Sequence, residues 1–118
     1  MTSLIACIGH EGPAWEYVQK LILGASWEQV FLVCSEEGKS RFASQRQVHF
    51  ITVDSKQPLI ILVDEVRKAL DGKIADTDVA VNMALGTGKE HMALLSALLK
   101  LGLGIRLVAY TLDGVKEV

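Results

Sequence analysis

The residues best suited to chemistry in this chain cluster around one predicted turn. Residues Val79–Met92 read as a buried strand, then a turn with two glycines over Gly86–Lys89, then the start of an apolar helix. Such a junction directs backbone N–H groups and the positive end of a helix dipole at one point, which favours a bound anion. Thr87 adds a hydroxyl group, Lys89 a mobile positive charge, and His91 an imidazole that titrates near neutral pH. The pattern predicts a phosphate site, and a tight turn without any ligand is the alternative.

Strand and helix patterns alternate along the rest of the chain. Strands are expected at Ser3–Gly9, Gln29–Ser35, Val48–Val53, Asp78–Leu85 and Ile105–Tyr110, helices at Pro13–Gly24, Pro58–Leu70 and Lys89–Leu101, and a mixed-charge helix or loop at Glu36–Arg46. This alternation predicts one α/β domain over residues 1–118, built on a Rossmann-like, doubly wound and mostly parallel five-stranded sheet. We expect the strand order 3-2-1-4-5, with helices on both faces of the sheet.

A second loop that contains glycine is predicted to lie beside the first. In doubly wound sheets, ligands bind at the carboxyl ends of the strands, where the strand order reverses. The predicted order makes the first and fourth strands neighbours, so the loops Gly9–Gly12 and Gly86–Lys89 should meet at that point. The residues expected to contact a ligand there are Gly9, His10, Glu11, Gly12, Gly86, Thr87, Gly88, Lys89 and His91.

Composition excludes several classes of protein. The chain has 118 residues, of which 50% are hydrophobic and 22% charged, and its net charge is −2. These values are typical of a folded domain and argue against bulk electrostatic binding of duplex nucleic acid. No apolar run reaches the roughly 20 residues that span a membrane, and no signal peptide opens the chain, so we expect a cytoplasmic protein. Cys7 and Cys34 lack metal-ligand spacing, so free buried thiols are expected. No cluster of His, Cys and carboxylate residues has the spacing of a zinc site, and we expect neither a metal nor a cofactor.

Two common nucleotide-binding motifs do not fit the turn. A P-loop requires a glycine six residues before Lys89, where Met83 stands, and a serine or threonine directly after it, where Glu90 stands. The dinucleotide fingerprint requires a small residue where His91 stands. Neither Walker-type ATP hydrolysis nor NAD binding is therefore expected.

The residues around the turn resemble those of the CRISPR-associated Rossmann-fold (CARF) sensor domains. The shared features are a strand that ends in Asn82, the turn Gly86–Lys89 and the Ala- and Leu-rich helix Met92–Leu99. The opening strand Leu4–Gly9, followed by a loop and a helix, is similar to the first ligand-binding motif of that family, and Val30–Ser35 is similar to its next unit. The resemblance covers most of the chain in organisation and these short segments in motif.

This resemblance implies a homodimer that binds cyclic tetra- or hexa-adenylate across its two-fold axis, in antiviral defence. It adds Ser35 and Asn82 to the expected ligand-binding residues. The chain would be a stand-alone sensor, a sensor without its effector domain, or a ring-opening enzyme. Ring opening needs no metal, because a ribose 2′-OH can attack the adjacent phosphate. Lys89 would then stabilise the negative charge, and His10 or His91 would transfer the proton.

Two other functions are compatible with the sequence. In the first alternative, the chain is a small dimerisation or interaction module without a ligand. In the second, it is a domain that binds another nucleotide or phosphate compound. The helix Met92–Leu101 is apolar on nearly all sides, which is typical of a helix with two buried faces. One face would cover the sheet, and the other would contact a second subunit. A homodimer is therefore expected under the sensor hypothesis and the interaction hypothesis alike.

Overall fold

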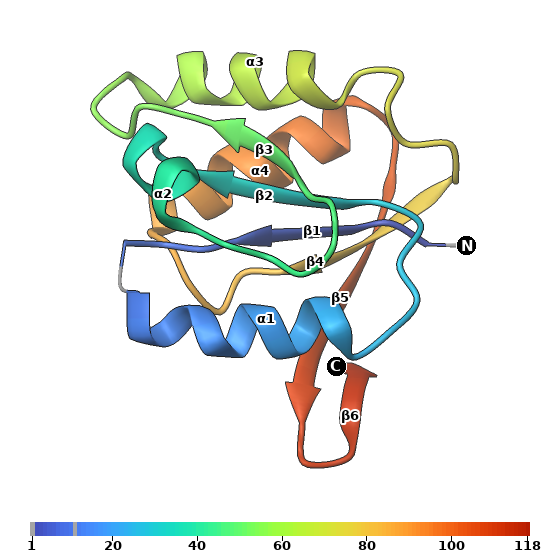
Figure 1. Ribbon diagram of the computed structural model, residues 1–118. Coiled ribbons are helices and arrows are strands. Elements are labelled where there is room, and N and C mark those ends of the chain that lie inside the picture. Colours follow the sequence, from blue (N-terminus) through green and yellow to red (C-terminus); the bar gives the residue numbers. More distant parts are fainter. Residues whose placement is uncertain (1, 11) are drawn as a thin grey trace.

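A six-stranded sheet lies between helices in the structure, a computed structural model that describes residues 2–10 and 12–118 (Figure 1). The elements in chain order are β1 (Leu4–Cys7), the 3-10 helix η1 (Gly12–Ala14), α1 (Trp15–Leu23), β2 (Val30–Cys34), α2 (Glu36–Arg41), β3 (His49–Thr52), α3 (Leu59–Leu70), β4 (Asp78–Asn82), α4 (Gly88–Lys100), β5 (Gly104–Thr111) and β6 (Gly114–Glu117). This is a Rossmann-like α/β fold. Within the described part of the chain, no helix is long and apolar enough to cross a bilayer.

The sheet has the order β3-β2-β1-β4-β5-β6. Its first five strands are parallel and follow the predicted order. The predicted total of five strands is wrong, because β6 adds an antiparallel strand beside β5. None of the four residues of β6 is buried, so this strand lacks the hydrophobic run by which the other strands were predicted. Thr111 Oγ1 holds its tight turn, where it accepts from Asp113 N–H at 3.1 Å and donates to the Gly114 carbonyl at 2.8 Å.

Helices cover both faces of the sheet, as predicted. On one face, Leu21 and Ile22 of α1 pack into a core with alternate residues of the strands. On the other face, Leu94 and Leu98 of α4 form a core together with residues of α3. All four residues of the central strand β1 are buried, because helices pack against it from both sides. The carboxyl ends of β1, β2 and β3 point to one edge of the sheet (Figure 1).

The strand β5 extends beyond its parallel neighbour β4. The pairing of these two strands ends at Val81 and Leu107, whereas β5 continues to Thr111. Over its last residues β5 pairs with β6, and this hairpin projects past α1 (Figure 1). The end of β4 and the second half of β5 therefore separate at the edge of the sheet where the candidate site lies.

Candidate functional site

The loops after β1 and β4 meet at the carboxyl edge of the sheet. Strands β1 and β4 are paired in parallel, so the two loops leave the sheet side by side. A Cβ atom at Gly9 would lie only 3.1 Å from the Gly86 nitrogen, and Gly9 has φ +64°. A Cβ atom at Gly86, which has φ +93°, would lie 3.1 Å from Cys7 Cβ and 3.0 Å from Glu90 Oε1. Only glycine at both positions permits this approach of the two backbones without strain.

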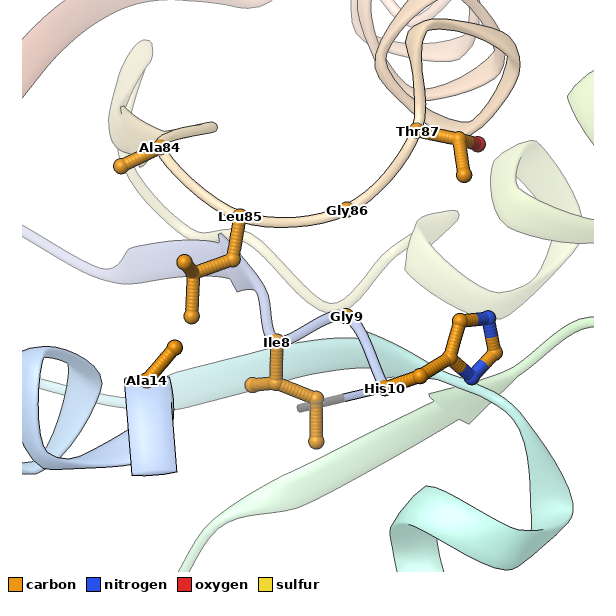
Figure 2. Close-up of a pocket in the computed structure, with 8 residues that line it drawn as sticks. All are labelled: Ile8, Gly9, His10, Ala14, Ala84, Leu85, Gly86 and Thr87. Atoms are coloured by element: carbon orange, nitrogen blue, oxygen red, sulfur yellow. The ribbon is translucent and has the colours of Figure 1, made fainter. Parts of the chain in front are cut away.

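A pocket of about 330 Å³ opens between these two loops (Figure 2). Its apolar wall consists of Ile8, Ala14, Ala84 and Leu85, and its other lining residues are Gly9, His10, Gly86 and Thr87. Figure 2 shows the Leu85 side chain directed towards Ala14, while the imidazole of His10 points away from both. The volume lies at the lower end of the range of roughly 300–1,000 Å³ that is usual for small-molecule sites. The pocket therefore offers an apolar wall beside the backbone of Gly9 and Gly86.

The helix α4 begins at the rim of this pocket with a capping box. Thr87 Oγ1 accepts from the Glu90 N–H at 3.2 Å, and Glu90 Oε1 accepts from the Thr87 N–H at 2.8 Å. Glu90 is only 3% exposed, so its carboxylate lies beneath the turn. Among the described residues, nothing accepts a hydrogen bond from the N–H groups of Gly88 and Lys89. These two donors remain available to an anion at the positive end of the helix dipole.

The side chain of Lys89 turns towards the loop after β3. Its Nζ atom donates to the Ser55 carbonyl at 2.8 Å, and the residue does not line the pocket between the two glycine loops. The predicted positive charge therefore lies at the loop after β3, and Ser55, its partner, lines a neighbouring larger hollow rather than this pocket. A phosphate held by the N–H groups of α4 would be within the electrostatic field of this ammonium group.

The side chain of His91 holds the turn in place. Its Nε2 atom lies 2.7 Å from the Leu85 carbonyl oxygen. A carbonyl oxygen only accepts, so Nε2 carries the proton in this contact. His91 Nε2 would also lie 3.4 Å from a Cβ atom at Gly86. The imidazole thus supports the pocket wall from the side of the helix, and a ligand could meet only its other nitrogen.

His10 is exposed and borders both this pocket and a larger hollow of about 800 Å³ beside it. The charged residues around the larger hollow are Glu36, Glu37, Asp54, Lys56, Glu65 and Lys68. Ser35 also lines the hollow, and its Oγ accepts from the Gly38 N–H at 3.0 Å as the N-terminal cap of α2. Carboxylates outnumber lysines here, so this second hollow disfavours a polyanion. Gly12 opens η1, and the predicted ligand contact Glu11 lies outside the described residues.

Asn82 is 4% exposed, and its polar atoms bond within the protein. Its Nδ2 atom donates to Tyr17 Oη at 3.0 Å and to the Val108 carbonyl at 2.8 Å. Its Oδ1 atom accepts from the Ala84 N–H at 3.1 Å. The structure therefore places this residue behind the pocket wall. Of the four predicted glycines, Gly9 and Gly86 line the pocket, whereas Gly12 and Gly88 do not.

Sequence reasoning missed three residues that shape the site. Glu90 could have been found, because Thr-x-x-Glu before an apolar run is the sequence pattern of a capping box. Tyr17 and Ser55 carried no such signal. Tyr17 lies within a predicted helix, and nothing in the pattern of that helix marks its hydroxyl group as a partner of Asn82. Ser55 contributes a backbone carbonyl, which a residue of any type would provide. Their roles depend on which elements become neighbours in the fold.

The two thiols are free and buried, as expected from the sequence. Burial raises the pKa of Cys7 from 9.0 to about 12, and the charge of Glu90 contributes to the shift. Burial also raises the pKa of Cys34 to about 11. Both side chains are therefore protonated and unreactive at neutral pH.

These raised pKa values predict a loss of stability in alkali. An unfolded thiol releases its proton near pH 9.0, whereas folded Cys7 retains it up to about pH 12. Between these values the unfolded state binds fewer protons, so the free energy of unfolding falls as pH rises. Urea unfolding between about pH 8 and about pH 10 should show this fall, and Cys7→Ala should show a shallower one. Equal slopes for the two proteins would contradict the prediction.

No group of three or more His, Cys, Asp or Glu side chains in the described ranges could hold a metal ion. Comparison with known proteins finds neither a matching family model nor a matching curated sequence. The class of protein is therefore defined by the fold and the site alone: a Rossmann-like domain with two glycine loops meeting at the reversal of strand order.

Proposed function

We propose that this protein is a nucleotide-binding sensor domain of the CARF type that takes a cyclic oligoadenylate between the loops after β1 and β4. The observation that carries the proposal is the backbone contact of Gly9 and Gly86 beside the free N–H groups at the start of α4. Ligands of doubly wound sheets bind at this point of the topology. Helix N-termini bind phosphate through the same kind of N–H donor.

The two parts of the site match the two parts of a nucleotide. The apolar wall of Ile8, Ala14 and Leu85 would cover an adenine base. The N–H groups of Gly88 and Lys89 would bind the adjoining phosphate, with the Lys89 ammonium supplying an opposite charge. A pocket of about 330 Å³ holds one such unit rather than a whole ring. A cyclic ligand would therefore use two pockets, which a two-fold symmetric dimer brings together.

A homodimer is part of this proposal. Met92 and Leu99 on α4 are 58% and 68% exposed, and Leu95 lies between them at helical spacing. Ala93 and Ala97 lie on the buried side of the same helix. This apolar stripe of Met92, Leu95 and Leu99 is suited to contact the same stripe of a second subunit. A symmetric contact of this kind is the commonest form of protein dimer.

Removing the ammonium group of Lys89 should weaken ligand binding. On ligand binding the Lys89 ammonium would exchange the Ser55 carbonyl for a phosphate oxygen. Lys89→Ala would then remove one charge-assisted contact, worth about 1.5–3 kcal/mol, which corresponds to about 10- to 150-fold in affinity. Isothermal titration with cyclic tetra- and hexa-adenylate at two salt concentrations measures this loss. Added salt should weaken binding by the wild-type protein. Lys100→Ala is the matched control, since Lys100 is the exposed lysine at the opposite end of the same helix.

The same titration, repeated with AMP, separates the proposal from its alternatives. Binding of AMP but of neither cyclic compound would indicate a site for another nucleotide. If no adenine nucleotide produces heat or a thermal shift, the interaction module without a ligand takes the place of the sensor. Mass spectrometry of the titrated mixtures also reports ring opening. Of the two histidines expected to transfer the proton, His91 is bonded through Nε2 to the Leu85 carbonyl, so His10→Ala is the variant expected to abolish any turnover.

A further inference from the structure

Two side chains fill the gap where β5 separates from β4. Main-chain pairing of these strands ends at Val81 and Leu107. The next carbonyl of β5, that of Val108, accepts instead from Asn82 Nδ2 at 2.8 Å. Two residues further on, the N–H of Tyr110 donates to the hydroxyl group of Tyr17 at 3.2 Å. Side chains from β4 and α1 thus continue the hydrogen bonding of β5 that the main chain of β4 no longer supplies.

The orientation of the Asn82 amide follows from its partners. The Val108 carbonyl can only accept and the Ala84 N–H can only donate, so the nitrogen and oxygen of the amide cannot be exchanged. The second hydrogen of Nδ2 points to Tyr17 Oη at 3.0 Å. With Asn82 only 4% exposed, water cannot easily replace a lost partner. The amide group has a single satisfied orientation.

This junction also reaches the ligand pocket. Asn82 Oδ1 accepts from the N–H of Ala84, and Ala84 with Leu85 forms part of the pocket wall. One side chain therefore bonds to the wall on one side and to β5 and α1 on the other. If Ala84 and Leu85 move, the Asn82 amide must move with them, because the hydrogen bonds of the amide have fixed directions.

The geometry points to Asn82 and Tyr17 as a pair of positioning residues that hold the pocket wall and couple it to the β5–β6 hairpin. Neither side chain lines the pocket. Their effect on a ligand passes through Ala84 and Leu85. Because coupling between two sites is reciprocal, a ligand seated against this wall should protect the Tyr110 amide from exchange. That last expectation rests on the proposed function, whereas the coupling itself is testable without ligand.

The first experiment measures amide hydrogen exchange of the ligand-free protein by NMR. Tyr17→Phe keeps the aromatic ring and removes the hydroxyl group that accepts from Asn82 and Tyr110. We expect the Tyr110 amide to exchange about tenfold or more faster, as after loss of one hydrogen bond, and the Ala84 amide to shift in the spectrum. Tyr110→Phe is the matched control, since it removes a hydroxyl group that takes no part in the junction. Unchanged exchange at Tyr110 and an unchanged Ala84 signal in Tyr17→Phe would overturn the inference.

The second experiment measures affinity for cyclic tetra-adenylate. Tyr17→Phe and Asn82→Ala should each weaken binding about tenfold, and the double variant should bind no more than slightly worse than either one. Tyr110→Phe should bind like the wild type. Fully additive losses, or unaltered binding by Tyr17→Phe, would contradict the action of the two residues as a pair. Absence of binding by the wild type would refute the proposed function, and the exchange experiment would still decide the coupling.

Discussion

Gly86→Ala should destabilise the protein by about 2–4 kcal/mol, a sum of backbone strain and overpacking. The backbone of Gly86 has φ +93°, a region that residues with a Cβ atom rarely adopt. The added methyl group would also meet Cys7 Cβ at 3.1 Å and the buried Glu90 carboxylate at 3.0 Å. Relief of the Cys7 contact requires a shift of the loop that forms the pocket rim, and relief of the Glu90 contact requires a shift of that loop or of the carboxylate that accepts from the Thr87 N–H. The variant should therefore lose ligand binding beyond its loss of stability.

Gly88→Ala is the matched control for this experiment. Gly88 is the first residue of α4, and a Cβ atom there meets no heavy atom within 4 Å. Alanine also costs less conformational entropy than glycine in a helix, so this variant should be stable to within about 1 kcal/mol of the wild type or slightly more stable. Urea unfolding monitored by circular dichroism compares the three proteins. Equal stability of Gly86→Ala and Gly88→Ala would show that the loop contact is not as tight as the structure indicates.

Leu99→Lys should convert the proposed homodimer into a monomer. Leu99 is the most exposed member of the apolar stripe on α4, at 68%. An ammonium group without a partner, buried at a two-fold contact, costs about 3–5 kcal/mol, and each dimer would bury two of them. Sedimentation velocity at micromolar concentration measures the change in mass. The free energy of unfolding of the separated subunit should change little, because the side chain lies outside both cores.

Leu23→Lys provides the comparison for the dimer experiment. Leu23 is 54% exposed and belongs to α1, on the opposite face of the sheet from α4. This variant should retain the mass of the wild type. Loss of the dimer in Leu23→Lys, with Leu99→Lys unaffected, would move the contact to α1. A wild-type protein that sediments as a monomer at these concentrations would remove the dimer from the proposal, and a cyclic ligand would then meet a single pocket.

The amino-acid sequence by itself determined the parallel part of the fold. Buried strands such as β1 and β2 are continuous hydrophobic runs, and the amphipathic helices between the strands favour parallel pairing through right-handed crossovers. The order of the first five strands was predicted as that of a Rossmann-like sheet, and the structure has this order, which makes β1 and β4 neighbours and brings the loops together at Gly9 and Gly86. The strand β6 could not be found in the same way. It is half-exposed, and what supports it is the hairpin turn and its pairing with β5 rather than a hydrophobic run.

Only the tertiary structure decided where each polar side chain of the site points. Asn82, Lys89 and His91 all lie near the predicted turn, yet each bonds to a carbonyl from a different segment of the chain. Those carbonyls belong to Val108, Ser55 and Leu85. Backbone carbonyls are present at every residue, so no pattern of residue types marks the ones that will accept. The packing of β5, of the loop before α3 and of the turn itself brings them within hydrogen-bonding distance, and that packing is a property of the whole fold.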